Sequence, residues 1–238
     1  MIIDLKNYQT RAFSQFGQDG VLQKIFEKIA PVNKQFVEFG SSANDEGMGN
    51  TAYLRRFGWN GLLMNDTDKP YGVDIINKKY DLKVETVTAE NINELFKKYD
   101  VSELLGFLSI DVDGNDYWIW KALSDIYKPA VICIEANTYI PFERNIVQKY
   151  DIAWRWKGDA QFGSSVKALY DLGVSKGYSL IACCVSDLIF IRNELMPRFV
   201  EFKDMNNVEK LMENIPELDA LKENAVKEIN AFDGWVQL

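Results

Sequence analysis

Acidic residues directly follow two apolar runs in the middle of the chain. Residues 107–116 read FLSIDVDGND, and residues 131–135 read VICIE. If the two apolar runs form neighbouring parallel strands, their ends lie about 4.8 Å apart and Asp111 approaches Glu135. Two such carboxylates can share a proton or hold a hard divalent ion such as Mg²⁺ through oxygen ligands. The alternative is a turn in which these side chains cap the next helix or hold an ammonium group.

The chain contains no histidine, which restricts the chemistry available to these carboxylates. Histidine is the usual acid or base near neutral pH, so its absence leaves proton transfer to Asp, Glu, Tyr, Lys, Cys or a metal-bound group. Histidine triads and histidine metal sites are excluded. We therefore predict Asp111 or Asp113 as the catalytic carboxylate, and Asp111, Glu135 and Asn137 as the candidate metal ligands.

Apolar runs that end on a polar residue occur repeatedly, with helix-like segments between them. This alternation predicts a parallel sheet whose ligands bind beyond the carboxyl ends of the strands. Two later apolar runs, joined at Ser186-Asp187, predict an antiparallel hairpin at the edge of the sheet. The expected fold class is therefore α/β. The runs are 36–40, 62–66, 107–111 and 131–135, with a further strand near 82–87 and the hairpin at 178–185 and 188–192.

Composition narrows the classes of protein and partner. A chain of 238 residues that is 47% hydrophobic can bury one core, so a single domain is expected. Its net charge of −8 argues against nucleic acid as the partner. Its cysteines lack CxxC spacing, its start lacks a basic region before an apolar one, and it has no run of about eighteen apolar residues. We therefore expect a cytoplasmic protein that is neither exported nor membrane-spanning.

The loop after the first predicted strand, 40–47 (GSSANDEG), lies where a nucleotide-type cofactor meets the backbone in such folds. It is not GxGxxG, and Glu38, Asp45 and Glu46 make its surroundings negative. These charges repel a pyrophosphate and attract an ammonium and a sulfonium, which favours S-adenosylmethionine over NAD. Asp66, at the end of the second strand, is suited to accept hydrogen bonds from ribose hydroxyls, unless it only begins a turn.

Several blocks of the sequence resemble the FkbM-like class I methyltransferases, in particular members associated with bacterial capsule and surface-polysaccharide genes. The resemblance runs from about residue 14 to residue 195, and its most specific parts are 14–20 and 111–116. It departs at Ser42, where many class I enzymes have glycine, and at Asn65-Asp66, where Glu is commoner. The blocks are SQFGQDG at 14–20, FVEFG at 36–40, Asn50-Thr51, LSIDVDGND at 108–116 and GSS at 163–165.

This resemblance implies a Rossmann-like class I methyltransferase fold, S-adenosylmethionine as the methyl donor and an oxygen nucleophile as the acceptor. It implies that the methionine part binds around Glu38, Gly40 and Ser41, the ribose at Asp66 and the adenine side near Thr88. The metal hypothesis is similar to the catechol-type O-methyltransferases, in which carboxylates and an amide at these two strand ends hold a metal. The full set of expected cofactor contacts is Gln18, Glu38, Gly40, Ser41, Asn44, Asn50, Asp66, Thr88 and Asp111.

The long connection 138–163 follows the fifth predicted strand and carries several aromatic side chains. Segments this long commonly form lids, and Trp with Asp or Gln suits stacking and hydrogen bonding of a sugar. Its basic residues suit a phosphorylated or nucleotide-linked acceptor. The alternative is an insertion that packs its tryptophans on the core. The expected acceptor contacts are Tyr139, Trp154, Arg155, Trp156, Gln161, Phe162 and Ser164.

Together these features predict an S-adenosylmethionine-dependent O-methyltransferase that acts on a surface-glycan (capsule) precursor such as a sugar, a nucleotide-linked sugar or a phosphoramidate group. We expect the methyltransferase domain over 1–200 and a helical tail over 201–238. An apolar stripe on that tail either lies on a solvated helix or contacts a second copy of the chain. The stripe consists of Leu211, Ile215, Leu218 and Leu221.

Two other functions stay open at this point. One is an NAD-type nucleotide-sugar-modifying enzyme, which the acidic first loop and the lack of a Tyr-x-x-x-Lys signature near the fourth or fifth strand disfavour. The other is a non-catalytic regulator of glycan enzymes that binds S-adenosylmethionine. Normal cofactor affinity without turnover would distinguish the regulator from the enzyme.

Overall fold

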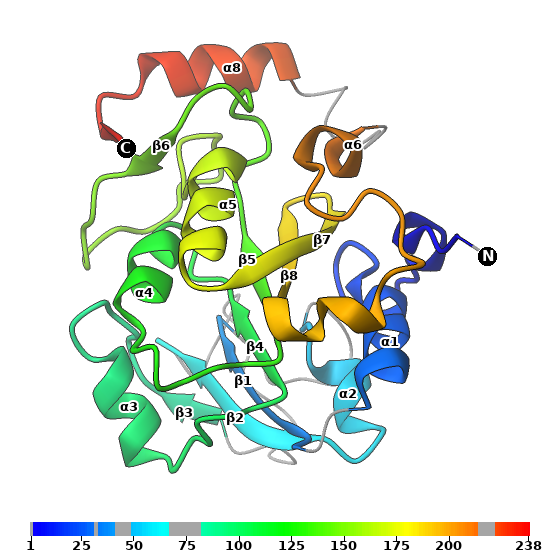
Figure 1. Ribbon diagram of the computed structural model, residues 1–238. Helices are drawn as coiled ribbons and strands as arrows, with labels where there is room; N and C mark the ends of the chain where they lie inside the picture. Colours follow the sequence, from blue (N-terminus) through cyan, green and yellow to red (C-terminus); the bar gives the residue numbers. More distant parts are fainter. Residues whose placement is uncertain (1, 31–32, 41–48, 67–81, 214–221) are drawn as a thin grey trace.

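The computed structural model describes residues 2–30, 33–40, 49–66, 82–213 and 222–238. Within these residues the main sheet has seven strands in the order β3-β2-β1-β4-β5-β8-β7 (Figure 1). The strands β1 to β5 are parallel, β8 is antiparallel to β5, and β7 is antiparallel to β8. Their bounds are β1 Gln35–Phe39, β2 Asn60–Asn65, β3 Leu82–Val84, β4 Phe107–Ile110, β5 Val131–Glu135, β7 Tyr178–Cys184 and β8 Asp187–Arg192.

This arrangement is a Rossmann-like α/β fold, a mostly parallel sheet with an antiparallel hairpin edge. The direction of winding reverses between β1 and β4, the point at which open α/β sheets leave a crevice for ligands. The predicted hairpin is confirmed, but its turn is Val185-Ser186, because Asp187 already pairs with Cys184. Val185 has a φ of 56°, a left-handed conformation that a β-branched residue rarely adopts.

Helices cover both faces of this sheet (Figure 1). On one face α1 packs its buried side chains, which recur at helical spacing, against Phe36 and Phe107. The other face carries α3, α4 and α5, which cover Val37 and Leu108. Because neighbouring strand residues are buried on opposite faces, these strands read as continuous apolar runs. The helices are α1 Gln18–Ile29, α2 Ala52–Arg55, α3 Ile92–Lys98, α4 Asp116–Ala122 and α5 Val166–Ser175, with 3₁₀ turns at Leu5–Tyr8 and Asn193–Arg198.

The C-terminal segment packs on the rest of the chain, and its last part, α8 (Lys222–Ala231) and β9 (Trp235–Gln237), lies over the 138–163 connection. The segment also contains α6 (Val208–Met212), and β9 pairs antiparallel with β6 (Ile146–Gln148). Helix α8, red in Figure 1, crosses above β6 and buries Ala225 and Ile229 against Ile140 and Ala160. The tail therefore packs on its own chain. Of the expected stripe, Leu211 is buried in α6, and Ile215, Leu218 and Leu221 lie outside the described residues.

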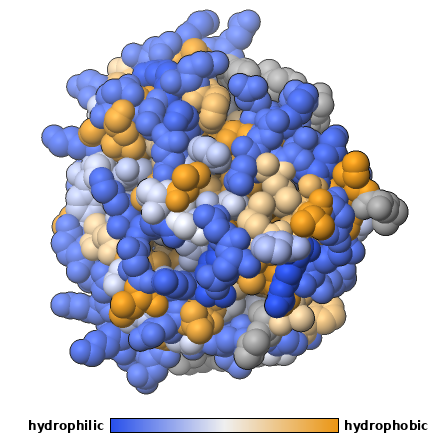
Figure 2. Space-filling view, viewed as in Figure 1, coloured by the Kyte–Doolittle hydropathy of each residue, from blue (hydrophilic) through white to orange (hydrophobic). Residues whose placement is uncertain are grey.

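Hydrophilic residues dominate the face seen in Figure 2, on which apolar residues occur in small groups. Two of the large exposed apolar side chains, Ile152 and Trp156, belong to the 138–163 connection. Among the described helices, none is both long enough and apolar enough to cross a membrane.

Candidate functional site

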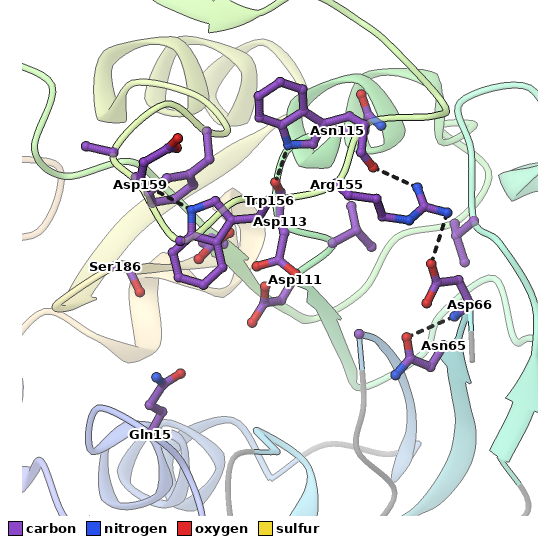
Figure 3. A pocket seen from close by; sticks show the side chains of 18 of the residues that line it. Gln15, Asn65, Asp66, Asp111, Asp113, Asn115, Arg155, Trp156, Asp159 and Ser186 are labelled. Carbon is purple, nitrogen blue, oxygen red and sulfur yellow. Dashed lines mark hydrogen bonds and ion pairs between the residues drawn. The ribbon is translucent and has the colours of Figure 1, made fainter. Parts of the chain in front are cut away.

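A cavity of about 880 Å³ opens at the carboxyl ends of the parallel strands (Figure 3). Its floor contains Gly40 after β1, Asp66 after β2, Asp111 after β4 and Glu135 at the end of β5. Its roof comes from residues 152–162 and from α8. The volume lies within the range of small-molecule and cofactor sites. The cavity is therefore at the predicted crevice.

Gly40 brings the end of β1 against the end of β4. Its φ is 71°, and a Cβ at this position would overlap the carbonyl oxygen of Asp111. Only glycine fits this combination of left-handed backbone and close approach. Ser41 and Asn44, two of the expected cofactor contacts, lie outside the described residues.

Three other expected cofactor contacts, Gln18, Glu38 and Asn50, do not line the cavity. Glu38 is buried, where it accepts a hydrogen bond from the backbone N–H of Asn50 (2.6 Å) and another from the Thr51 hydroxyl. Burial raises the pKa of Glu38, and the Thr51 hydrogen bond opposes that rise. Asn50 Nδ2 in turn donates to Ser109 Oγ (3.0 Å), and the Gln18 amide donates to Asp187. These side chains support the cavity wall from behind.

Asp66 lines the cavity at the end of β2 and faces the roof. It forms an ion pair with Arg155 (3.2 Å), with 37% and 63% of the two side chains exposed (Figure 3). The neighbouring Asn65 Oδ1 accepts a hydrogen bond from the Asp66 backbone N–H (2.9 Å). An ion pair this exposed is worth at most about 1 kcal/mol, so a ligand can exchange with it at little cost. The structure thus joins a residue expected to bind cofactor with one expected to bind acceptor.

Thr88 also lines the cavity and begins the turn before α3. Its Oγ1 accepts a hydrogen bond from the Asn91 backbone N–H (3.2 Å), and Asn91 Oδ1 accepts one from the Thr88 N–H (2.8 Å). This reciprocal pair stabilises the turn that leads into α3. The Tyr150 hydroxyl donates to Glu90 and accepts from the Ala89 N–H (3.2 Å), which ties the roof to this turn.

Three carboxylates gather at the ends of β4 and β5. The ligand oxygens of Asp111, Asp116 and Glu135 lie within 4.8 Å of one another. No Lys or Arg among the described residues forms an ion pair with them, and Glu135 Oε2 is buried without a hydrogen-bond partner there. Burial, followed by repulsion from neighbouring carboxylates, raises the pKa of Asp111 and of Glu135 well above the ordinary range. Such a cluster suits shared protons or a cation.

Asp116 shapes the loop between β4 and α4. It is fully buried, and its two oxygens accept the backbone N–H groups of Val112 (2.8 Å) and Gly114 (2.9 Å). Burial raises the pKa of Asp116 to about 6, and these hydrogen bonds oppose a larger rise. The sequence analysis considered Asp116 only as a possible helix cap and predicted Asn137 as the third candidate metal ligand. In the structure it is Asp116 that lies in the cluster with Asp111 and Glu135.

Asn137 is buried and holds the roof instead. Its Nδ2 donates to the carbonyls of Ala160 (2.8 Å) and Phe162 (2.9 Å), and its Oδ1 accepts from the Tyr139 N–H (3.2 Å). These bonds engage both ends of the amide. Its assignment as a metal ligand stays a prediction.

Asp113 lies in the centre of the cavity, between Asp111 and the roof (Figure 3). Its φ is 57°, and its carbonyl accepts a hydrogen bond from Trp154 Nε1 (3.1 Å). A Cβ on the next residue, Gly114, would lie 2.7 Å from the Trp154 ring, so glycine allows this close packing. Burial, and then the charge of Asp66, raises the pKa of Asp113.

The roof presents aromatic side chains to the cavity. Tyr139, Trp154, Trp156 and Phe162 line it, and Trp156 is 49% exposed. Arg155 lines it as well. Two further expected acceptor contacts lie elsewhere: Gln161 donates to the Glu228 carbonyl (3.2 Å), and Ser164 is fully buried.

Several residues that line the cavity were not predicted. They include Gln15 before α1, Ser186 in the β7–β8 turn, Asn115 near the roof, and Asn224 and Glu228 on α8. The block 14–20 pointed to the right segment, but the residue that faces the cavity is Gln15 rather than Gln18. No local pattern marks Glu228, since its place depends on how the tail packs on the roof through the Ala160 N–H (2.8 Å).

Neither a protein-family model nor a curated protein sequence matches the chain. Among solved structures, it is similar to the MycE methyltransferase from the mycinamycin biosynthetic pathway. One structure, in complex with Mg, SAH and mycinamycin VI, has a TM-score of 0.43 and 12% identity over 73% of this chain and 49% of that chain. Another, with Mg and SAH, has a TM-score of 0.45 and 13% identity over 82% and 56%. The chain spans about half the length of these solved chains, and its fold is identified by its own strand order.

Proposed function

We propose that this protein is an S-adenosylmethionine-dependent O-methyltransferase. The observation that supports this most strongly is that Asp66, Gly40 and Asp111, from the ends of β2, β1 and β4, line one acidic cavity. The carboxylate after β2 suits ribose hydroxyls, and the carboxylate after β4 suits an ammonium group. The fit is better for a cationic cofactor than for a pyrophosphate, since the described lining contains seven carboxylates and one Arg.

The residues of the chain have distinct roles in this proposal. Asp66 binds the ribose hydroxyls, Thr88 and its neighbours border the adenine side, and Asp111 binds the ammonium of the methionine part. Glu38 and Asn50 act from behind by holding the chain at Asn50 and Thr51 against β1 and β4. When bound, the cofactor supplies a methyl group already activated by a positively charged sulfur.

Asp113 is the proposed general base. A sugar hydroxyl is a poor acid, so its proton has to be removed as the methyl group moves. The raised pKa of Asp113 makes its carboxylate a stronger base than an exposed one, and its central position allows contact with an acceptor under the roof. The protein otherwise acts by aligning donor and acceptor.

The carboxylate cluster offers a second route. Asp111 and Glu135, with Asp116 beside them, provide hard oxygen donors that fit Mg²⁺. An ion held there would lower the pKa of an acceptor hydroxyl, so that Asp113 would not need to act as the base. Calorimetric titration with Mg²⁺ and with EDTA separates the two routes, because only the second predicts binding that Glu135→Gln weakens.

The acceptor we propose is a surface-glycan precursor, in keeping with the resemblance in the sequence. Trp156 and Phe162 provide a face on which a sugar ring can stack, and Asp159 and Asn115 provide hydrogen-bonding groups at the rim. Whether the acceptor is a free sugar, a nucleotide-linked sugar or a phosphoramidate is decided by assay.

The test is formation of S-adenosylhomocysteine from S-adenosylmethionine with a panel of these acceptors. We expect turnover on at least one, and a loss of at least about 100-fold in Asp113→Asn with cofactor affinity kept. Cofactor binding without turnover on any acceptor would favour a non-catalytic regulator. Binding of NAD in place of S-adenosylmethionine would favour the nucleotide-sugar enzyme.

A further inference from the structure

The methionine part of the proposed cofactor carries two opposite charges, and the cavity provides for only one of them with charged side chains. The carboxylates that line the cavity suit the ammonium group of the cofactor. Among the described residues that line the cavity, Arg155 is the only Lys or Arg, and it pairs with Asp66 at the β2 end. The cofactor carboxylate at the other end therefore needs neutral hydrogen-bond donors.

Gln15 is such a donor. It lines the cavity together with Phe16, and Figure 3 shows its amide pointing into the opening, across from Asp111 and below Ser186. The Gln15 side chain is exposed and has no hydrogen-bond partner among the described residues. The hydroxyl of Ser186 lines the same end of the cavity, opposite the Asp66 end.

The loop that carries Gln15 is fixed on both sides. On one side the buried Asp19 accepts the backbone N–H groups of Ala12 (2.9 Å), Phe13 (2.6 Å) and Ser14 (2.9 Å). On the other side Gln18 Oε1 accepts the N–H of Phe16 (2.8 Å). A carboxylate that accepts three backbone N–H groups holds a loop firmly, so the backbone on both sides of Gln15 is held in place while its side-chain amide is not used by the fold.

We propose that Gln15, together with the Ser186 hydroxyl at the same end of the cavity, binds the carboxylate of the methionine part of S-adenosylmethionine, and that Asp19 positions Gln15. This inference rests on the proposed function. It assigns the residues that distinguish the complete cofactor from an adenosine compound without its amino-acid end.

The experiment compares three ligands by calorimetry: S-adenosylmethionine, decarboxylated S-adenosylmethionine and 5′-methylthioadenosine. The variants are Gln15→Ala, Gln15→Glu and the control Gln23→Ala, whose exposed side chain lies on α1 and does not line the cavity. We expect Gln15→Ala to weaken S-adenosylmethionine about tenfold and to leave the other two ligands within about twofold. Gln15→Glu keeps the size of the side chain but repels a carboxylate. It should therefore weaken S-adenosylmethionine further and leave decarboxylated S-adenosylmethionine unchanged or tighter.

The possible outcomes separate this inference from the proposed function. If the wild-type protein binds S-adenosylmethionine and both Gln15 variants bind it equally well, Gln15 does not bind the carboxylate and the proposed function stands. Equal weakening of all three ligands also overturns the inference, because Gln15 would then act on the adenosine end or on the fold. If the wild type binds none of the ligands, the proposed function and this inference both fail.

Discussion

Carboxylates gather in and beneath the floor of the cavity, without a matching set of cations among the residues that the structure describes. Asp116, Glu135 and Asp187 have raised pKa values, and burial is the largest cause for each. Hydrogen bonds from backbone N–H groups offset the cost of burying the Asp116 carboxylate, and a hydrogen bond from the Gln18 amide does the same for Asp187. A buried acid of this kind is held most easily in its protonated form, so the stability of the protein should depend on pH.

Asp187 gives this dependence a direct test. Its pKa is raised from 3.8 to about 7, so between these values the folded state binds a proton that the unfolded state has released. The contribution of Asp187 to the free energy of unfolding is therefore fully present below pH 3.8 and declines as the pH rises to about 7. Asp187→Asn keeps an acceptor for Gln18 and cannot ionise. We expect it to raise the free energy of unfolding by about 2 kcal/mol at pH near 8 and to change it little near pH 4.

Urea unfolding at several pH values measures this difference, with Asp125→Asn as the control because Asp125 is an exposed partner of Lys176. The control should follow the wild-type curve. If the stability of Asp187→Asn depends on pH as steeply as that of the wild type, or if the variant is less stable above neutral pH, the pKa of Asp187 is not raised in the folded protein.

At the scale of elements, the strand ends make the floor of the site and the 138–163 connection makes its roof. The floor was predictable, because each strand is a local apolar run that stops on a polar residue, as Phe107–Ile110 stops before Asp111. The roof was predictable only in outline. Its length marked it as a lid, but the roles of Gln161 and Asn137 depend on partners far away in the sequence.

Asn137 provides the test at this scale. Its amide is the buried donor to the Ala160 and Phe162 carbonyls, so Asn137→Ala leaves both without this partner. We expect a loss of about 1–3 kcal/mol in stability and faster proteolysis within the roof. Asn115→Ala removes a more exposed bond to the Asp151 carbonyl (2.8 Å) and should have a smaller effect. Equal effects of the two variants would mean that Asn137 does not anchor the roof.

At the scale of the whole molecule, the site is assembled from nearly the full length of the chain. Gln15 and Glu228 line the same cavity although most of the sequence separates them. Local sequence patterns predict single helices and strands. That Glu228 reaches the same cavity as Gln15 depends on α8 packing over β6, for which the sequence contains no local signal. The tail was therefore expected as a solvated helix or an oligomer contact, and the structure shows it against its own roof.

Ile229 tests this coupling between tail and roof. It is fully buried under α8 beside Ile140 and Ala160. Ile229→Ala should cost about 2–5 kcal/mol and loosen both segments, so hydrogen exchange should rise in α8 and in residues 149–163 together while the main sheet stays protected. Val174→Ala, at a half-exposed position of α5, is the control. An increase confined to α8 would contradict the coupling.

The central claim is that the cavity binds S-adenosylmethionine with its ribose on Asp66. Calorimetric titration of the wild type, Asp66→Ala and the control Asp125→Ala tests it most directly. We predict micromolar binding to the wild type and the control, and binding weaker by about 10–100-fold in Asp66→Ala, because hydrogen bonds to a charged group are lost. No binding to the wild type, or equal affinity in all three proteins, would contradict the claim.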